Sequence, residues 1–156
     1  MTADLTLGVI SDTHGLLRPE ALLALEGSDL ILHAGDVGRP GILDQLADIA
    51  PVRAVRGNID KGAWAEVLPE SDVVDTGSHL LYMLHNLDEL DLSPEAAGFA
   101  AVIYGHSHKP ETFRRQGVLY LNPGSAGPRR FSLPVSIARL ELQSESLVAQ
   151  LIEIGK

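Results

Sequence analysis

Five apolar, strand-like segments of this chain each end at a short polar loop, and this repeated ending is what most constrains the fold. The segments are residues 5–11, 29–33, 52–56, 79–84 and 100–104, each short enough to be a buried strand. Glycine follows within two residues at Gly35, Gly57 and Gly105 and would break the strand there. In open α/β sheets, ligands bind at the carboxyl ends of the strands. The side chains after these segments are therefore the first candidates for a functional site.

Two helices are predicted between the first three segments. One begins at Pro19 and ends before Gly27, and the other runs from Pro40 to about Ala50, where Pro51 stops it. An alternation of strand and helix predicts parallel strands joined by right-handed crossovers.

Strand-like segments dominate from residue 72 onward, with further candidates at 72–76, 111–115, 118–121, 135–142 and 147–154. The dipeptides Gly77-Ser78 and Gln116-Gly117 predict hairpins, and Ser93-Pro94 predicts the start of a short helix. We therefore expect a mostly antiparallel second half. The whole is expected to be a mixed α/β protein with two packed sheets and helices outside, built as one domain over residues 1–156.

Side chains with oxygen or nitrogen donor atoms follow the strand-like segments in every case. The set is Asp12, His14, Asp36, Asn58, His85, His106 and His108. Taken singly, each has a plain reading as a turn former, a helix cap or a hydrogen-bonded histidine. Taken together, they indicate one polar site built from several loops. Carboxylate, imidazole and amide donors without sulfur favour Mn²⁺, Fe, Co²⁺, Ni²⁺ or Zn²⁺.

Composition excludes several other classes of function. The chain has no cysteine, which removes disulfides and thiolate metal sites. Its net charge of −9 argues against broad nucleic-acid binding. No apolar run approaches the ~20 residues of a membrane span, and the N-terminus lacks the basic start of a signal peptide, so we expect no membrane association and a cytoplasmic protein. A regulatory nucleotide-binding module is disfavoured because no glycine-rich phosphate loop is present.

The ordered motifs resemble the calcineurin-like metallophosphoesterase superfamily. They are Asp12-x-His14, Gly35-Asp36, Gly57-Asn58-x-Asp60, His85 and Gly105-His106-x-His108. The small size and the loop from Asn122 to Ser125 are similar to the short phosphodiesterases of the YfcE type. The resemblance implies a four-layer α/β/β/α sandwich of two mixed sheets, metallophosphoesterase-like, with a two-metal site at the sheet edges.

The resemblance also assigns roles by position. A first metal would be held by Asp12, His14 and His108, a second by Asn58, His85 and His106, with Asp36 as the bridge. Two divalent ions, with Mn²⁺ the first choice, would supply a bridging hydroxide that hydrolyses a small phosphodiester. Asp36, Asn58 and His106 are the expected catalytic residues. Ile59 stands where many superfamily members carry a histidine that protonates the leaving group, which favours diesters over monoesters.

Other residues receive smaller roles. His33 and Asp60 are expected to support the ligands from behind, with a turn-forming role left open for Asp60. Arg129 and Arg130 are candidates to bind the phosphate of the substrate. Association into a homo-oligomer is also expected. The alternative function is a protein-interaction scaffold similar to Vps29, in which the metal site would be vestigial or structural.

Overall fold

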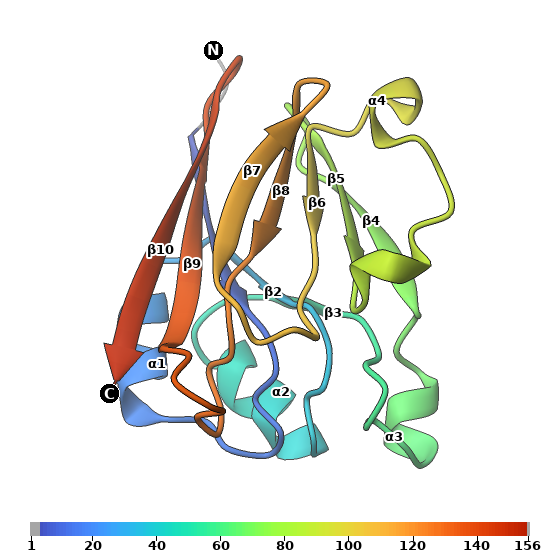
Figure 1. The fold of residues 1–156 in the computed structure, drawn as a ribbon. Coiled ribbons are helices and arrows are strands. Elements are labelled where there is room, and N and C mark those ends of the chain that lie inside the picture. The colour runs from blue at the N-terminus through green and yellow to red at the C-terminus, as the bar shows by residue number, and fades with distance from the viewer. Residues whose placement is uncertain (1–3, 156) are drawn as a thin grey trace.

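Two five-stranded sheets packed face to face form this protein, whose computed structural model describes residues 4–155 (Figure 1). The first sheet has the order β10-β9-β1-β2-β3, with β1 Leu5–Ile10, β2 Leu30–His33, β3 Val52–Ala54, β9 Val135–Leu142 and β10 Leu147–Gly155. The second has the order β4-β5-β6-β8-β7, with β4 Ser71–Asp75, β5 Leu80–Leu84, β6 Ala101–Ile103, β7 Glu111–Arg115 and β8 Val118–Asn122.

Each sheet contains three neighbouring parallel strands. In the first sheet β1, β2 and β3 are parallel, joined by α1 Pro19–Leu25 and α2 Pro40–Ala47, as the alternating pattern predicts. The expected hairpins join β4 to β5 and β7 to β8, and Gln116 and Gly117 take φ values of 51° and 80° in the second turn. The centre of the second sheet differs from the antiparallel expectation, because β5, β6 and β8 are parallel. The chain between β5 and β6 crosses back through η1 Leu87–Glu89 and α4 Pro94–Ala97, which makes this pairing possible.

The apolar core lies in three layers around the sheets. Between the sheets, Leu7 and Val9 of β1 pack in one cluster with Leu81 and Met83 of β5, all fully buried. The helices α1 and α2 cover the outer face of the first sheet. On the outer face of the second sheet, Leu87 of η1 and the following Leu90 pack against the buried cluster. Because η1 has only three residues, the fourth layer of the sandwich is thin. A further short helix, α3 Ala63–Glu66, lies outside the predicted pattern.

The parallel strands explain where polar loops gather. The carboxyl ends of β1, β2 and β3 meet at one end of the first sheet, and those of β5 and β6 lie at the same end of the second, at the bottom of Figure 1. Loops from both sheets therefore converge there. Within residues 4–155, no helix is both long enough and apolar enough to cross a membrane.

Candidate metal centre

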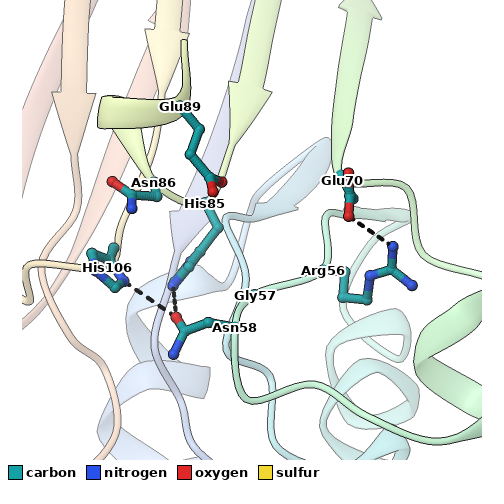
Figure 2. Close-up of a pocket in the computed structure, with 8 residues that line it drawn as sticks. All are labelled: Arg56, Gly57, Asn58, Glu70, His85, Asn86, Glu89 and His106. Atoms are coloured by element: carbon teal, nitrogen blue, oxygen red, sulfur yellow. Dashed lines mark hydrogen bonds and ion pairs between the residues drawn. The ribbon is translucent and has the colours of Figure 1, made fainter.

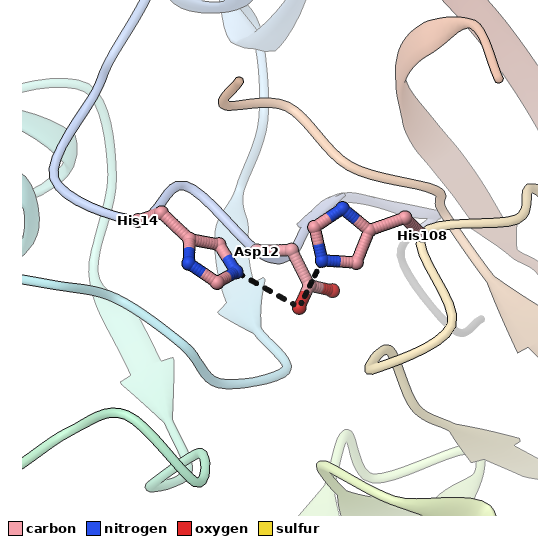
Figure 3. A group of neighbouring side chains, drawn as sticks. All are labelled: Asp12, His14 and His108. Carbon is pink, nitrogen blue, oxygen red and sulfur yellow. Dashed lines mark ion pairs between the residues drawn. The ribbon is translucent and has the colours of Figure 1, made fainter. Parts of the chain in front are cut away.

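The loops after β1, β2 and β6 bring four of the predicted side chains together in a buried group. His14 Nε2 lies 3.7 Å from Asp12 Oδ1 and 3.4 Å from Asp36 Oδ2. His108 Nε2 lies 3.4 Å from the same Asp12 Oδ1 (Figure 3). Three ligand atoms, one each from Asp12, His14 and His108, thus lie close enough to share a metal ion.

The remaining three predicted side chains extend this group toward solvent. His85 Nε2 lies 3.2 Å from Asp36 Oδ2. The same ring nitrogen lies 3.0 Å from Asn58 Oδ1, and His106 Nδ1 lies 3.2 Å from that amide oxygen (Figure 2). Asp12, Asp36 and His85 also form a group that could hold a metal ion. The seven predicted side chains therefore form one continuous cluster across both sheets.

Local hydrogen bonds orient these side chains so that each turns one possible metal-ligand atom toward the centre of the cluster. Asp12 Oδ2 accepts from the Ser11 hydroxyl at 2.7 Å and from the His106 N–H at 3.1 Å, which leaves Oδ1 facing the histidines. Asp36 Oδ1 accepts from the Ile59 N–H at 3.1 Å, which leaves Oδ2 between two imidazoles. His85 Nδ1 donates to the Ala34 carbonyl at 2.8 Å, so its Nε2 turns a lone pair toward the cluster.

The chemistry of the donor set fits a bound cation. Asp12 Oδ1 and His14 Nε2 are buried and have no hydrogen-bond partner among residues 4–155, although buried polar atoms nearly always have one. Two ligands at about 2.1 Å from one ion stand roughly 3 Å or more apart, as these atoms do. Asn58 Oδ1 likewise faces two ring nitrogens, and a half-turn of this amide would make its nitrogen donate to them instead. A shared cation would satisfy these lone pairs together.

Charges within the cluster shift several pKa values. Burial raises the pKa of Asp12, but the neighbouring His14 ring and the charges of His85 and His108 outweigh burial, so the pKa falls below its usual range. The pKa of Asp36 is also lowered, because His85 and the Ile59 N–H outweigh the cost of burial. Burial lowers the pKa of His85, but Asp36 and Asp12 reverse this and raise it. Both carboxylates are therefore held in the charged form that a metal requires.

Unusual backbone conformation marks the same residues. Seven residues other than glycine have positive φ in the described chain, and five of them belong to the cluster: Asp12 (56°), His14 (47°), Asp36 (57°), His106 (73°) and His108 (64°). Left-handed backbone costs about 1–3 kcal/mol per residue and persists only where the surroundings impose it. The fold therefore maintains several strained positions to present these side chains.

At two glycines of the motifs, neighbouring atoms come too close for any side chain to fit. A Cβ on Gly57 would overlap the backbone and carboxylate of Asp36, and one on Gly105 would overlap the Ser11 hydroxyl. Here the glycines serve packing within the cluster.

Asp60 and His33 are buried beside the cluster and bind the backbone and side chains of its loops. The buried Asp60 carboxylate accepts three backbone N–H groups, from Gly57 at 2.9 Å, Val37 at 3.2 Å and Gly38 at 2.9 Å. It therefore joins the loop before Asn58 to the loop after Asp36 through backbone groups.

His33 braces a different pair of loops. Its Nδ1 accepts from the Gly35 N–H at 3.1 Å, so Nε2 carries the proton and donates to the Thr13 hydroxyl at 3.0 Å. Thr13 in turn donates to the Val37 carbonyl at 2.8 Å. Complete burial lowers the pKa of His33 to about 4, partly against the charge of Asp12, so the ring is neutral at neutral pH.

The sequence did not reveal the supporting roles of three further residues, Ser11, Thr13 and Asn122. Asn122 donates to the Gly105 carbonyl and to the Ser107 hydroxyl, both at 3.1 Å, and so fixes the loop that carries His106 and His108. Ser11 and Thr13 are short polar residues flanking Asp12, which is the one signal that could have marked them. The predicted Arg129 and Arg130 are exposed, and the charge of Arg130 contributes to lowering the pKa of the nearby His108, after burial.

Comparisons with known proteins identify one family and one shared fold. The model of the calcineurin-like phosphoesterase superfamily domain matches residues 5–145. A probable metallophosphoesterase of Methanothermobacter thermautotrophicus is 35% identical, over 96% of this chain and 92% of the relative. The phosphodiesterase YfcE of Escherichia coli is 26% identical, over 90% of this chain and 94% of that protein. The crystal structure of Vps29 from Chaetomium thermophilum has a TM-score of 0.79 at 24% identity, covering 93% of this chain and 86% of Vps29, which shows a shared fold.

Proposed function

This chain belongs to the calcineurin-like phosphoesterase superfamily, and we propose that it hydrolyses phosphodiesters at a two-metal centre formed by the seven clustered side chains. The family implies divalent metal ions, and the chain contains groups of side chains that could hold them. The observation that carries the proposal is the convergence of buried, unpartnered donor atoms from Asp12 and His14 with donors from both sheets.

The geometry suggests how the ligands divide. Asp12, His14 and His108 would hold one ion, and Asn58, His85 and His106 the other. Asp36 Oδ2 lies near both His14 and His85, which supports a bridging role. Two such ions, Mn²⁺ first among Fe, Co²⁺, Ni²⁺ and Zn²⁺, would supply hydroxide near neutral pH and neutralise charge on the phosphoryl group.

In this scheme, residues of the chain would orient and bind the phosphoryl group of the substrate. Asn58 and His106 would face the phosphoryl group, because they are the exposed members of the cluster. Asp36, which is buried, would act with them from below as the bridge between the ions. Arg129 and Arg130 would attract the phosphate from the side of His108.

Ile59 supports a diester as the substrate class. Its backbone N–H binds Asp36, and its apolar side chain is 40% exposed beside the cluster and holds no proton to donate. Without a general acid, a leaving group that needs a proton departs about 10²–10⁴-fold more slowly. We expect an aryl diester such as bis-p-nitrophenyl phosphate to be hydrolysed with a higher kcat/KM than p-nitrophenyl phosphate. Because both release p-nitrophenolate, which leaves without a proton, this comparison measures the preference for a diester, and a diester with an alkyl leaving group would measure the effect of the missing acid.

The test pairs metal analysis with diester hydrolysis in excess Mn²⁺. We expect up to two metal ions per chain, and a loss of at least about 10²-fold in hydrolysis for Asp36→Asn. Asp44→Asn, an exposed position on α2, is the matched control and should behave as wild type. A wild-type rate for Asp36→Asn would contradict the bridging role. No hydrolysis by a metal-loaded wild type would instead favour the scaffold function suggested by the similarity to Vps29.

A further inference from the structure

A cavity of about 190 Å³ opens beside the exposed side of the cluster (Figure 2). Three proposed metal ligands, Asn58, His85 and His106, form part of its lining. A phosphoryl group at the metal centre would therefore place one of its two ester groups in or next to this cavity. A cavity of this size suits a small alcohol.

The rest of the lining is polar and carries an unbalanced charge. Arg56 is the one cationic side chain among the lining residues, and its guanidinium is paired with Glu70 at 3.2 Å. Glu89 adds a second carboxylate, and no ion pair of Glu89 is found within residues 4–155. The lining is therefore negative by one charge when its histidines are neutral.

The negative surface continues away from the metal centre. A second hollow, of about 150 Å³, shares Glu70 and Glu89 with the cavity and adds Asp91 and Tyr82. Carboxylates accept hydrogen bonds and cannot donate them. A wall of this kind attracts ammonium and hydroxyl groups and repels a further anionic group.

Resting on the proposed function, we propose that this cavity binds one ester group of the substrate and selects small alcohols rich in hydrogen-bond donors, hydroxylated or amino, against alcohols that carry another anion. Arg56 and Glu89 are its specificity-determining residues with opposite effects. Glu89 favours a cationic ester group directly. Arg56 limits that preference because it neutralises Glu70.

The test uses three p-nitrophenyl phosphodiesters that share one leaving group and differ in the charge of the other ester group. These are the 3-aminopropyl, 3-hydroxypropyl and 2-carboxyethyl esters, assayed with Mn²⁺ at low ionic strength. We expect kcat/KM to fall in that order, by about two- to fivefold per unit of charge, and the differences to shrink in high salt.

Two variants move the preference in opposite directions. Glu89→Gln should lower the ratio of kcat/KM for the aminopropyl over the carboxyethyl ester by about two- to fivefold, and Arg56→Gln should raise it by a similar factor. Glu145→Gln, at the exposed turn between β9 and β10, is the matched control and should leave the ratio unchanged. Melting temperatures report whether each variant is folded.

The outcomes separate this proposal from the proposed function. Hydrolysis of bis-p-nitrophenyl phosphate together with a ratio that neither variant changes, or a wild-type preference for the carboxyethyl ester, would overturn the cavity assignment alone. Absence of hydrolysis of every diester in the metal-loaded wild type would overturn both.

Discussion

The two sides of the cluster differ in how deeply their side chains are buried and in how many hydrogen bonds hold their loops. Asp12 and His108 are almost completely buried, at 0% and 6% exposure, and are held by loops that His33, Thr13 and Asn122 brace. On the other side, Asn58 and His106 are exposed and meet each other through a single amide oxygen. We call these the buried half and the open half. A site that must grip its metal and also admit substrate can divide the two tasks in this way.

The difference has a physical cause in the sheets. The buried half lies where the loop after β1 meets the loop after β6, and Gly105 allows the two to touch. In the open half, Asn58 lies on the loop after the edge strand β3, and His106 is an exposed residue of the loop after β6. The contact between the loops after β1 and β6 thus buries one half, while the edge position of β3 leaves Asn58 exposed in the other.

Removing a ligand of the buried half should have the largest effect. Asp12→Ala deletes an atom that both candidate metal groups use, so we expect hydrolysis to fall by about 10³-fold or more and metal content to fall with it. Raising the Mn²⁺ concentration should not restore the rate. Recovery of the rate at high Mn²⁺ would show that the two halves are equivalent.

The open half should tolerate loss better. His106→Ala removes an exposed side chain that we propose as a ligand, and we expect a loss of about 10²-fold in kcat/KM that added Mn²⁺ partly restores. Graded dialysis against a chelator should likewise release the ions in two steps. Simultaneous release of both ions would contradict the division between the halves.

The buried half also predicts a pH dependence of stability. The folded pKa of His33, about 4, lies below its unfolded value near 6.5, because the buried ring resists protonation. Its contribution to the free energy of unfolding is therefore complete above pH 6.5 and is lost as the pH falls toward 4. In metal-free protein this amounts to about 2 kcal/mol between pH 7 and pH 5. Denaturant melts of wild type and His33→Gln should show a shallower pH slope for the variant; equal slopes would contradict the assignment.

The smallest effect is expected at Asp60, whose carboxylate joins the loop before Asn58 to the loop after Asp36. In Asp60→Asn the amide can accept two of the three backbone N–H groups and must turn its own N–H₂ toward the third. We expect metal affinity to fall about 10-fold, mostly in the open half, with a modest loss of melting temperature. Asp29→Asn, whose carboxylate binds the Thr6 N–H far from the cluster, is the control for stability alone.

The sequence predicted the main features because they depend on local signals. Strand ends, glycine breaks and the order of motifs placed seven donors in one region, and the family resemblance and the two-sheet fold are confirmed. The roles assigned to individual ligands stay predictions.

The features that the sequence did not reveal depend on contacts between distant segments. The bond from the His106 N–H to Asp12 joins residues 94 positions apart and exists only once the two sheets pack. The left-handed backbone at Asp12 and Asp36 has no signature in side chains that are common in turns. The three amide donors to Asp60 and the charge of the cavity at Arg56 likewise follow from tertiary packing.

The apolar layer between the sheets contains none of the seven donors, which all lie on loops beyond its edge. Architecture and chemistry are thus encoded by separate sets of residues. A lineage carrying this sandwich can lose these polar side chains one substitution at a time and still inherit a folded body, free to be used for another purpose.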